Sequence, residues 1–514
     1  MTLKVYASRM SQPSRAVLIF CKFNGIEFEE VKIDFEKREQ FSPEYKEVNP
    51  MRKVPTIVDG RFKLFESHAI LIYIASVFPQ VAHHWYPADL FKRAKIHSVL
   101  DWHHLNLRRG TAGYVHNSTV APLLGVPLNP KAAAEDEKLL RSSLYKLETV
   151  WLKGSGRFLL GGNQPSIADL SLVCEIMQLE LLDEQDRNRI LGPYKKVQQW
   201  IEDTRKATQP HFDEVHKALF RTKERLQKQR TAGANSETES NVKPILSSKM
   251  INGIEFEEVE VGMFKREQLS PESTLIGSND VLFTPQVSGI EFEEFKIDFK
   301  KREQFSPEYE EINPMNKVPT IVDGRFKLFE SHAILIHLAS VFPQVAHHWY
   351  PADLFKRANI HSVLDWHHLN LRHGAVGYVL NSSVAPLLGE PLNPQAAAEG
   401  EKLLCLSLYN LETIWLKGSG RFLLGGNHPS IADLSLVCEI MQLELLDEQD
   451  RNRILGPYRK VRLWIEDTRK ATQPHFDEVH KALFRTKERL QKQRTAGANS
   501  ETVSNIKPIL SSKM

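Results

Sequence analysis

The chain is poor in cysteine, in long apolar runs and in excess charge, and each shortage excludes a class of protein. Its 514 residues include four cysteines, isolated in apolar stretches, so we expect buried thiols rather than a disulfide framework. No stretch is long and apolar enough to span a bilayer, and the N-terminus lacks the pattern of a secretory signal. The net charge of +3 is too small for a general nucleic-acid binder. We expect a soluble intracellular protein without membrane or nucleic-acid partners.

The chain contains a long internal repeat. The segment Ile26 to Met250 recurs almost letter for letter as Ile290 to Met514, so that Trp85 corresponds to Trp349. The opening of the first copy, Met1 to Phe23, has no counterpart in the second. The repeat divides the chain into two units of ordinary two-domain size, here called the first and second units. It indicates a tandem duplication whose second copy lacks the N-terminal strand and helix.

Each unit is predicted to contain two domains. "LKVYA" and "FEEVKID" have the pattern of strands, and "PSRAVLIFCKFNG" between them has that of a helix closed by Gly25. A further strand, a "VDGR" turn and a helix complete a thioredoxin-like α+β domain, and the pattern is all-helical from Asp89 onward. Ser166 with Asp169, and Ser430 with Asp433, are spaced as helix capping boxes.

The predicted boundaries follow from this layout. Residues 229–287 read as a linker, because "TAGANSETESNVKPILSSKM" is polar and aperiodic and a degraded copy of "NGIEFEEV" follows it. "DVLFTPQ" at 280–286 is expected to replace the missing first strand. The predicted domains are residues 1–80 (thioredoxin-like), 88–228 (helical), 229–287 (linker), 288–344 (truncated thioredoxin-like), 352–492 (helical) and 493–514 (mobile tail).

The candidate chemistry lies in the loop after the first predicted strand, which reads Ser11-Gln12-Pro13-Ser14. A thioredoxin-like redox enzyme places Cys-x-x-Cys there. Serine cannot form a disulfide, but its hydroxyl and the helix N–H groups can hold a thiolate that a substrate brings. Lowering a thiol pKa by about two units needs about 2.7 kcal/mol, and one hydrogen bond to a charged group supplies about 1.5–3 kcal/mol. The alternative is that Ser11 only caps the helix.

Two further segments suit a small thiol peptide. "KVPTIVDG" has Val54-Pro55 before a strand, where a cis bond would direct a backbone N–H and C=O towards an extended peptide. "FESHAI" places Glu66 and Ser67 at a helix start, where an acid can meet an amino group and N–H groups can hold a carboxylate.

The segments "SQPSRA", "NPMRKVPTIVDG", "FESHAILIY" and "DWHHLNLRRG" together resemble the plant theta-class glutathione transferases. The resemblance covers the whole first unit and the second from Ile290. It implies that Ser11 is catalytic and stabilises the glutathione thiolate, that the backbone of Val54 binds the cysteinyl part, and that reduced glutathione is a co-substrate, with no permanently bound cofactor. The residues of the implied glutathione site are Ser11, Gln12, Gln40, Lys53, Val54, Glu66 and Ser67.

The second substrate is expected between the two domains, along "DWHHLNLRRGTAGYV". The candidate residues there are Trp102, His103, Asn106 and Arg109. Arg109 would steady negative charge on a leaving group, or only cap a helix; the second unit has His373 there. Metal is not expected, because adjacent histidines such as His103 and His104 diverge on a helix.

The resemblance implies an enzyme of detoxification that joins glutathione to electrophiles, xenobiotic or lipid-derived, with peroxidase activity towards organic hydroperoxides. Catalysis is expected from the first unit only, and chains are expected to form homodimers through it. The alternatives are a non-catalytic ligand-binding protein and a fused gene model of two transferases. The ending Ser512-Lys513-Met514 is close to a peroxisomal address, so we expect the cytoplasm and/or the peroxisome, with the nucleus as the alternative that the basic segment 221–230 leaves open.

Overall fold

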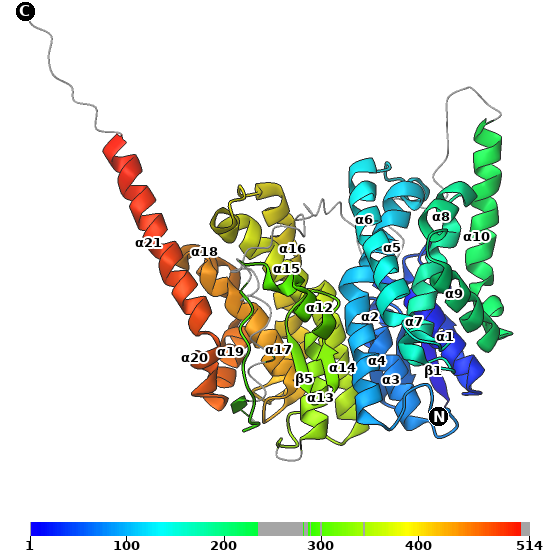
Figure 1. The fold of residues 1–514 in the computed structure, drawn as a ribbon, viewed down its shortest axis with the longest axis horizontal. Helices are drawn as coiled ribbons and strands as arrows, with labels where there is room; N and C mark the ends of the chain where they lie inside the picture. The colour runs from blue at the N-terminus through cyan, green and yellow to red at the C-terminus, as the bar shows by residue number, and fades with distance from the viewer. Residues whose placement is uncertain are drawn as a thin grey trace, which may run out of the picture.

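The computed structural model describes residues 2–234, 281, 286–287, 289–298, 301–342 and 345–504. Within these residues the two units lie side by side along the longest axis of the molecule (Figure 1). The repeated fragment and the C-terminal Ser512-Lys513-Met514 lie outside the described residues, as does most of the expected linker. No helix among the described residues combines the length and the apolar character that crossing a bilayer requires.

The first unit begins with a four-stranded sheet in the order β2-β1-β3-β4. β1 pairs in parallel with β2 and antiparallel with β3, which pairs antiparallel with β4. Leu3, Val5 and Ala7 alternate towards the core, as expected of a strand with one buried face. The strands predicted from the sequence are confirmed: β1 (Leu3–Ala7), β2 (Phe28–Lys32), β3 (Thr56–Asp59) and β4 (Phe62–Phe65).

The helices of this domain cover the sheet and end where the sequence provides a stop signal. After α1 the chain turns at Gly25, whose φ of 62° is a left-handed conformation that glycine adopts without strain. Pro13 near the start of α1 fits the first turn, where its missing N–H is not needed. The helices are α1 (Gln12–Phe23), η1 (Glu39–Phe41), α2 (Pro43–Val48) and α3 (Ser67–Val77).

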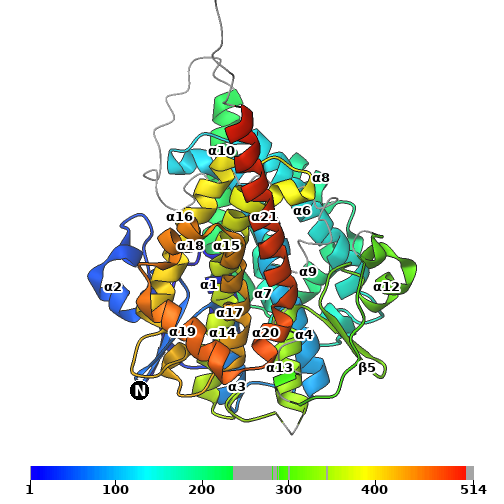
Figure 2. The same ribbon diagram turned by 90° about the vertical axis from the view of Figure 1, so that its left-hand side faces the viewer.

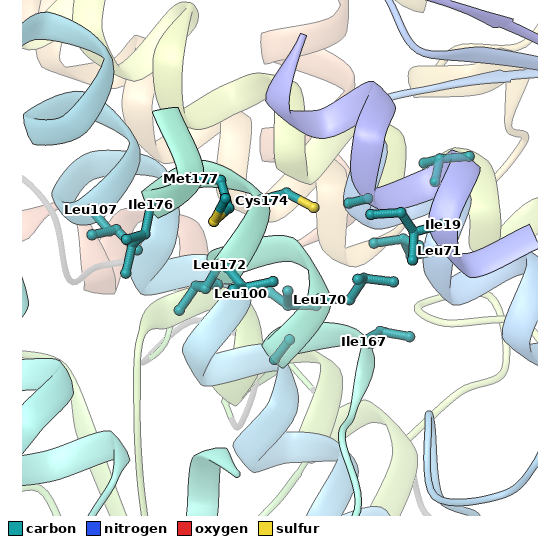
Figure 3. Close-up of a cluster of buried hydrophobic side chains, with 14 of the residues drawn as sticks. Ile19, Leu71, Leu100, Leu107, Ile167, Leu170, Leu172, Cys174, Ile176 and Met177 are labelled. Carbon is teal, nitrogen blue, oxygen red and sulfur yellow. The ribbon is translucent and has the colours of Figure 1, made fainter. Parts of the chain in front are cut away.

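The rest of the first unit is helical, as predicted, and α7 lies at its centre. Side chains of α7 such as Leu170 pack with Ile19 of α1, Leu71 of α3 and Leu100 of α4 (Figure 3). The core therefore joins the two domains. The elements are α4 (Leu90–His103), η2 (His104–Arg108), α5 (Arg109–Val115), η3 (His116–Val120), η4 (Ala121–Leu124), α6 (Pro130–Lys146), η5 (Leu147–Trp151), η6 (Leu159–Gly161), α7 (Ile167–Ile176), η7 (Met177–Leu181), α8 (Glu184–Leu191), α9 (Lys195–Ala207) and α10 (His211–Ala234).

The second unit repeats this order from η9 onward, but its described sheet has only β5 and β6. Its elements are η9 (Glu303–Phe305), α12 (Pro307–Ile312), β5 (Thr320–Asp323), β6 (Phe326–Phe329), α13 (Ser331–Val341), α14 (Leu354–Leu369), α15 (Leu371–Val379), η10 (Leu380–Val384), η11 (Ala385–Leu388), α16 (Pro394–Asn410), η12 (Leu411–Trp415), η13 (Leu423–Gly425), α17 (Ile431–Ile440), η14 (Met441–Leu445), α18 (Glu448–Leu455), α19 (Arg459–Ala471), α20 (His475–Val479) and α21 (Lys481–Ser504).

Two sequence predictions for this unit need correction. Residues 281 and 286, the described residues of the expected replacement strand, have helical backbone instead, and Val281 packs in the core of the second unit. Residues 493–504 of the expected mobile tail are helical instead, because α21 continues to Ser504, and the rest of that segment lies outside the described residues. A polar composition does not exclude helix where residues such as Ala and Glu favour it.

The two units pack through α3 and α4 against α14 and α13, with nearly symmetrical contacts. Ser98 Oγ donates to the carbonyl of Phe329 at 2.8 Å, and Ser362 Oγ donates to that of Phe65 at 2.8 Å. The small domains face opposite sides, with α2 on one side and α12 and β5 on the other (Figure 2). The second unit covers the α3/α4 face, so the predicted homodimer through the first unit would need another face.

Candidate functional site

Three loops of the first unit meet at one edge of the sheet. Tyr6 near the end of β1 pairs with Thr56 at the start of β3, and Thr56 pairs with Phe65 at the end of β4. The loop after β1, the segment before β3 and the turn after β4 therefore leave the sheet side by side. They carry Ser11, Val54 and Glu66, so the sheet register brings the predicted residues together.

Ser11 is at the position before the first residue of α1, with extended backbone (φ −80°, ψ 123°). Its side chain makes no capping hydrogen bond, although its backbone carbonyl accepts from Arg15 N at 3.0 Å. The side chain is nearly buried, and so is that of Gln12. The hydroxyl therefore does not serve the helix as a cap, which weakens the alternative interpretation of this serine.

Val54 lies in an extended segment held from behind. The carbonyl of Lys53 accepts hydrogen bonds from Tyr45 Oη at 2.6 Å and from Asn49 Nδ2 at 2.7 Å. The Val54-Pro55 bond is cis, as the sequence analysis anticipated. In the described part of the chain, the backbone N–H and C=O of Val54 have no hydrogen-bond partner. They are available to an extended ligand.

Glu66 precedes α3 with a left-handed backbone conformation, and Ser67 is the first residue of the helix. Glu66 has a φ of 69°, a left-handed conformation that costs a non-glycine residue about 1–3 kcal/mol. Burial raises the pKa of the Glu66 carboxyl to about 7, against the opposing charge of Lys53. Ser67 is the first residue of the helix and is partly exposed. The start of α3 thus presents a carboxyl group beside the backbone N–H groups of Ser67 and His68, which have no hydrogen-bond partner among the described residues.

The second unit reaches into this region through two residues that the sequence analysis missed. Lys53 Nζ donates to Asn370 Oδ1 at 3.2 Å, and burial lowers the pKa of Lys53. Asp365 Oδ2 accepts from Ala69 N, in the first turn of α3, at 2.9 Å. Only the packing of the units shows these contacts. The sequence did contain one signal, because Asn370 and Asp365 repeat Asn106 and Asp101 of the first unit.

The remaining predicted glutathione residue, Gln40, lies in η1 and is 2% exposed. Its position before α2 places it on the segment that leads to Lys53. The structure therefore places all seven predicted residues in the first small domain.

The predicted second-substrate residues are mostly in the packed interior. Trp102 is 2% exposed and packs against Trp151 with ring centroids 5.9 Å apart. Asn106 Nδ2 donates to the carbonyl of Trp102 at 2.7 Å, and His103 Nδ1 lies 3.2 Å from His68 Nε2. The predicted role of these residues stays a prediction, and their burial does not support it. Arg109 is partly buried, and burial lowers its pKa against the charge of Asp136.

The second unit keeps the equivalents of Lys53, Val54 and Glu66 but not that of Ser11. Glu330 again has a positive φ, 73°, and Lys317 Nζ lies 3.4 Å from Asn106 Oδ1 of the first unit. Val318-Pro319 is cis. The position equivalent to Ser11, residue 275, is a leucine and lies outside the described residues.

Comparison with known proteins agrees with this geometry. The family model "Glutathione S-transferase, N-terminal domain" matches residues 1–76 and 277–340. Glutathione S-transferase T1 of Arabidopsis thaliana is 68% identical over 250 residues, which are 49% of this chain and 100% of that protein.

Two other comparisons cover different shares of the relatives. Glutathione S-transferase T2 of Arabidopsis thaliana is 68% identical over 251 residues, 49% of this chain and 42% of that longer protein. A human glutathione transferase theta-2 structure, in complex with glutathione and an unknown ligand, is 32% identical over 44% of this chain and 91% of that one, with a TM-score of 0.40. On the identity and full-length coverage of the T1 relative, the chain belongs to the theta class of glutathione S-transferases.

Proposed function

We propose that the first unit conjugates reduced glutathione to electrophilic compounds of xenobiotic or lipid origin, with Ser11 as the catalytic residue. The observation that carries the proposal is the meeting of Ser11, Val54 and Glu66 at one sheet edge. To bind a thiol peptide with an amino-acid end, a site needs a group that donates a hydrogen bond to the thiolate, an extended backbone that pairs with the peptide, and an acid that binds the ammonium group. All three groups are supplied within one small domain.

Ser11 acts on the sulfur. Its hydroxyl makes no bond to the helix, so it can donate to a thiolate placed at the start of α1. One hydrogen bond to a charged group contributes about 1.5–3 kcal/mol, and the helix end adds about 0.3–1 kcal/mol. Together they match the approximately 2.7 kcal/mol needed to lower a thiol pKa by about two units.

The other residues hold the rest of the peptide. The N–H and C=O of Val54 pair with the cysteinyl backbone, as a strand added to a sheet edge would. Glu66 receives the γ-glutamyl ammonium, and the N–H groups at the start of α3 receive its carboxylate. Gln12 lines the start of α1, while Gln40 and Lys53 face the glycine carboxylate.

The electrophile meets the thiolate on the side of the helical domain. Arg109 is the candidate to steady a leaving group there, because its side chain is partly exposed while Trp102, His103 and Asn106 are buried. The same thiolate supports a peroxidase activity: it attacks the outer oxygen of an organic hydroperoxide, releases the alcohol and becomes a sulfenic acid. A second glutathione then reduces the sulfenic acid to give the disulfide and water.

Catalysis by the first unit alone follows from what the second unit keeps and lacks. Lys317, Val318 and Glu330 repeat the peptide-binding residues. No residue of its described part corresponds to the serine at the start of α1. The described part of the second unit therefore keeps peptide-binding residues but has no serine to activate the sulfur.

The test is the change Ser11→Ala. We expect turnover with glutathione and a chlorodinitrobenzene-type electrophile to fall about 10- to 100-fold, the loss of about 1.4–2.7 kcal/mol of thiolate stabilisation. The KM for the electrophile should change little, because Ser11 acts on sulfur.

The matched control is Ser14→Ala. Ser14 lies on the same helix, is fully buried, and its hydroxyl has no hydrogen-bond partner among the described residues. Its variant should keep wild-type turnover. Unchanged turnover in Ser11→Ala, or an equal loss in both variants, would contradict the assigned role.

A further inference from the structure

Behind the start of α3, the two units bring together side chains that bind metal ions. His68 comes from α3, His104 from the beginning of η2, and Asp365 from α14 of the second unit. Their ligand atoms all lie within 4.8 Å of one another. The sequence predicts no metal site, because adjacent histidines diverge on a helix. The structure instead takes one ligand from each of three elements.

The spacing of these atoms fits an ion. Asp365 Oδ1 is 3.4 Å from His104 Nε2 and 3.8 Å from His68 Nδ1. Two ligands bound to tetrahedral Zn²⁺ at about 2.0–2.1 Å lie about 3.3–3.4 Å apart. The contact of His104 with Asp365 is a long hydrogen bond whose length matches the separation of two zinc ligands, whereas His68 Nδ1 would have to approach Asp365 more closely to share an ion with it.

The partners of His68 and Asp365 orient both residues for ligation. His68 Nε2 lies 2.8 Å from Ser171 Oγ, and the tautomer that can ligate through Nδ1 is the one in which Nε2 donates to this hydroxyl. Nδ1 then carries the lone pair, and it is buried without a hydrogen-bond partner in the described part of the chain. The second oxygen of Asp365 accepts from Ala69 N. Such outer hydrogen bonds are typical of metal ligands.

The electrostatics suit a cation. Burial lowers the pKa of His68 and of His104 well below the usual range, so both imidazoles are neutral near pH 7 and can ligate. Burial raises the pKa of Asp365, a cost that a bound cation would offset. A cavity of about 20 Å³ touches His68 and Asp365, which is enough for one water as a fourth ligand.

In the equivalent cluster of the second unit the aspartate contacts two histidines directly, although ring nitrogens of His332, His367 and His368 also lie within 4.8 Å of one another. Asp101 Oδ1 is 2.6 Å from His368 Nε2 and 3.2 Å from His332 Nδ1, so these groups bind each other directly. His367 Nδ1 likewise lies 3.2 Å from His332 Nε2. The backbone also differs, because η2 is a π-helical turn where α14 continues as regular helix to Leu369.

We propose that His68, His104 and Asp365 form a binding site for one divalent transition-metal ion of the zinc type, which links the two units. Its ligands come from both units, so the ion joins α3 and η2 to α14. Because His68 follows Glu66 and Ser67 directly, the ion also fixes the first turn of α3. This inference does not depend on the proposed reaction.

The test uses the full chain after removal of metal with a chelator. Zn²⁺ is titrated by calorimetry, and Co²⁺ is followed by the visible absorption of its tetrahedral complexes. We expect one ion per chain and a rise in Tm on binding. His104→Gln and Asp365→Asn, one change in each unit, should each weaken binding at least about 100-fold, because even loss of an outer partner costs about 10- to 100-fold.

His332→Gln is the matched control, since His332 is the residue of the second unit equivalent to His68 and packs against His367 and His368. It should still bind one ion with the wild-type cobalt spectrum. Unchanged Tm values without metal would show that the variants fold. Absence of saturable Zn²⁺ binding, binding that survives both ligand changes, or an equal loss in His332→Gln would overturn the proposal.

Discussion

Arg109 and Asp136 of the first unit are replaced as a pair in the second, where His373 and Gly400 stand at the equivalent positions. Asn117 Nδ2 donates to Asp136 Oδ2 at 2.9 Å, and the carboxyl group packs over Gly113. Burial raises the pKa of Asp136 to about 6. Ionisation of Asp136 therefore lowers the stability of the first unit. The residue lies beside Arg109, which among the four predicted second-substrate residues is the one that is partly exposed.

The first prediction concerns the pH dependence of stability. Because its folded-state pKa lies above the unfolded value, Asp136 favours the folded state at low pH and loses that contribution as the pH rises from about 4 through 6. Asp136→Asn should therefore raise the stability of the first unit by about 1–3 kcal/mol at pH 7–8 and by little near pH 4. Thermal unfolding across this pH range measures the change.

The second unit is the internal control for this prediction, since glycine stands at position 400. Its unfolding transition should not move. A stabilisation that is the same at all pH values would contradict the electrostatic cause.

At the scale of elements, the capping box of α7 holds several segments at once. The Asp169 carboxylate accepts from Leu159 N at 2.8 Å, from Ser166 N at 2.7 Å and from Trp200 Nε1 at 2.8 Å. It is fully buried, and the helix it begins is packed against α1, α3 and α4. Asp433 repeats these bonds in the second unit.

Asp169→Ala should therefore cost more than an ordinary cap. It leaves several buried donors unpaired, and we expect a loss of about 3–5 kcal/mol in the free energy of unfolding of the first unit. Asp433→Ala should have a similar effect on the second unit. Asp183→Ala, at the exposed start of α8, should cost only about 1 kcal/mol. Equal costs at positions 169 and 183 in urea unfolding would refute the argument.

At the scale of the molecule, the two hydrophobic cores interlock. Ala358 and Phe329 of the second unit belong to the core of the first, and Ala94 of the first unit belongs to that of the second. His97 and His361 stack at the centre of the interface, 5.2 Å apart and 4° from parallel. The two units of one chain thus pack as a pair. Both carry the peptide-binding residues, and the described serine site belongs to the first unit.

We expect this pairing to persist without the covalent link. A chain with a protease site inserted between residues 240 and 270 should still elute as one species after cleavage, because the hydrophobic cores of the two units share residues across the interface. Ala94→Arg should separate the halves, since a buried unpaired charge costs several kcal/mol. Ala134→Arg, on the exposed side of α6, is the matched control and should leave the halves associated. Size-exclusion chromatography with light scattering reports the outcome; separation of the unaltered halves would show that the link maintains the pair.

The sequence by itself determined the local structure of this protein. The strands of the first sheet, the turn at Gly25, the capping boxes and the position of Ser11 before a helix all depend on residues within a few places of each other, whose pattern of side chains predicts them. The repeat also predicted the reduced sheet of the second unit.

Tertiary structure decided which residues meet. Trp102, His103 and Asn106 carry polar or amphipathic side chains, and nothing in their own segment shows that packing buries them. Likewise Asp365 and Asn370 reach the first unit only because α14 packs on α3 across hundreds of residues of chain. Contacts between distant segments depend on how complete hydrophobic faces fit together, so the site that the two units share, and the histidine cluster between them, exist only in the folded molecule.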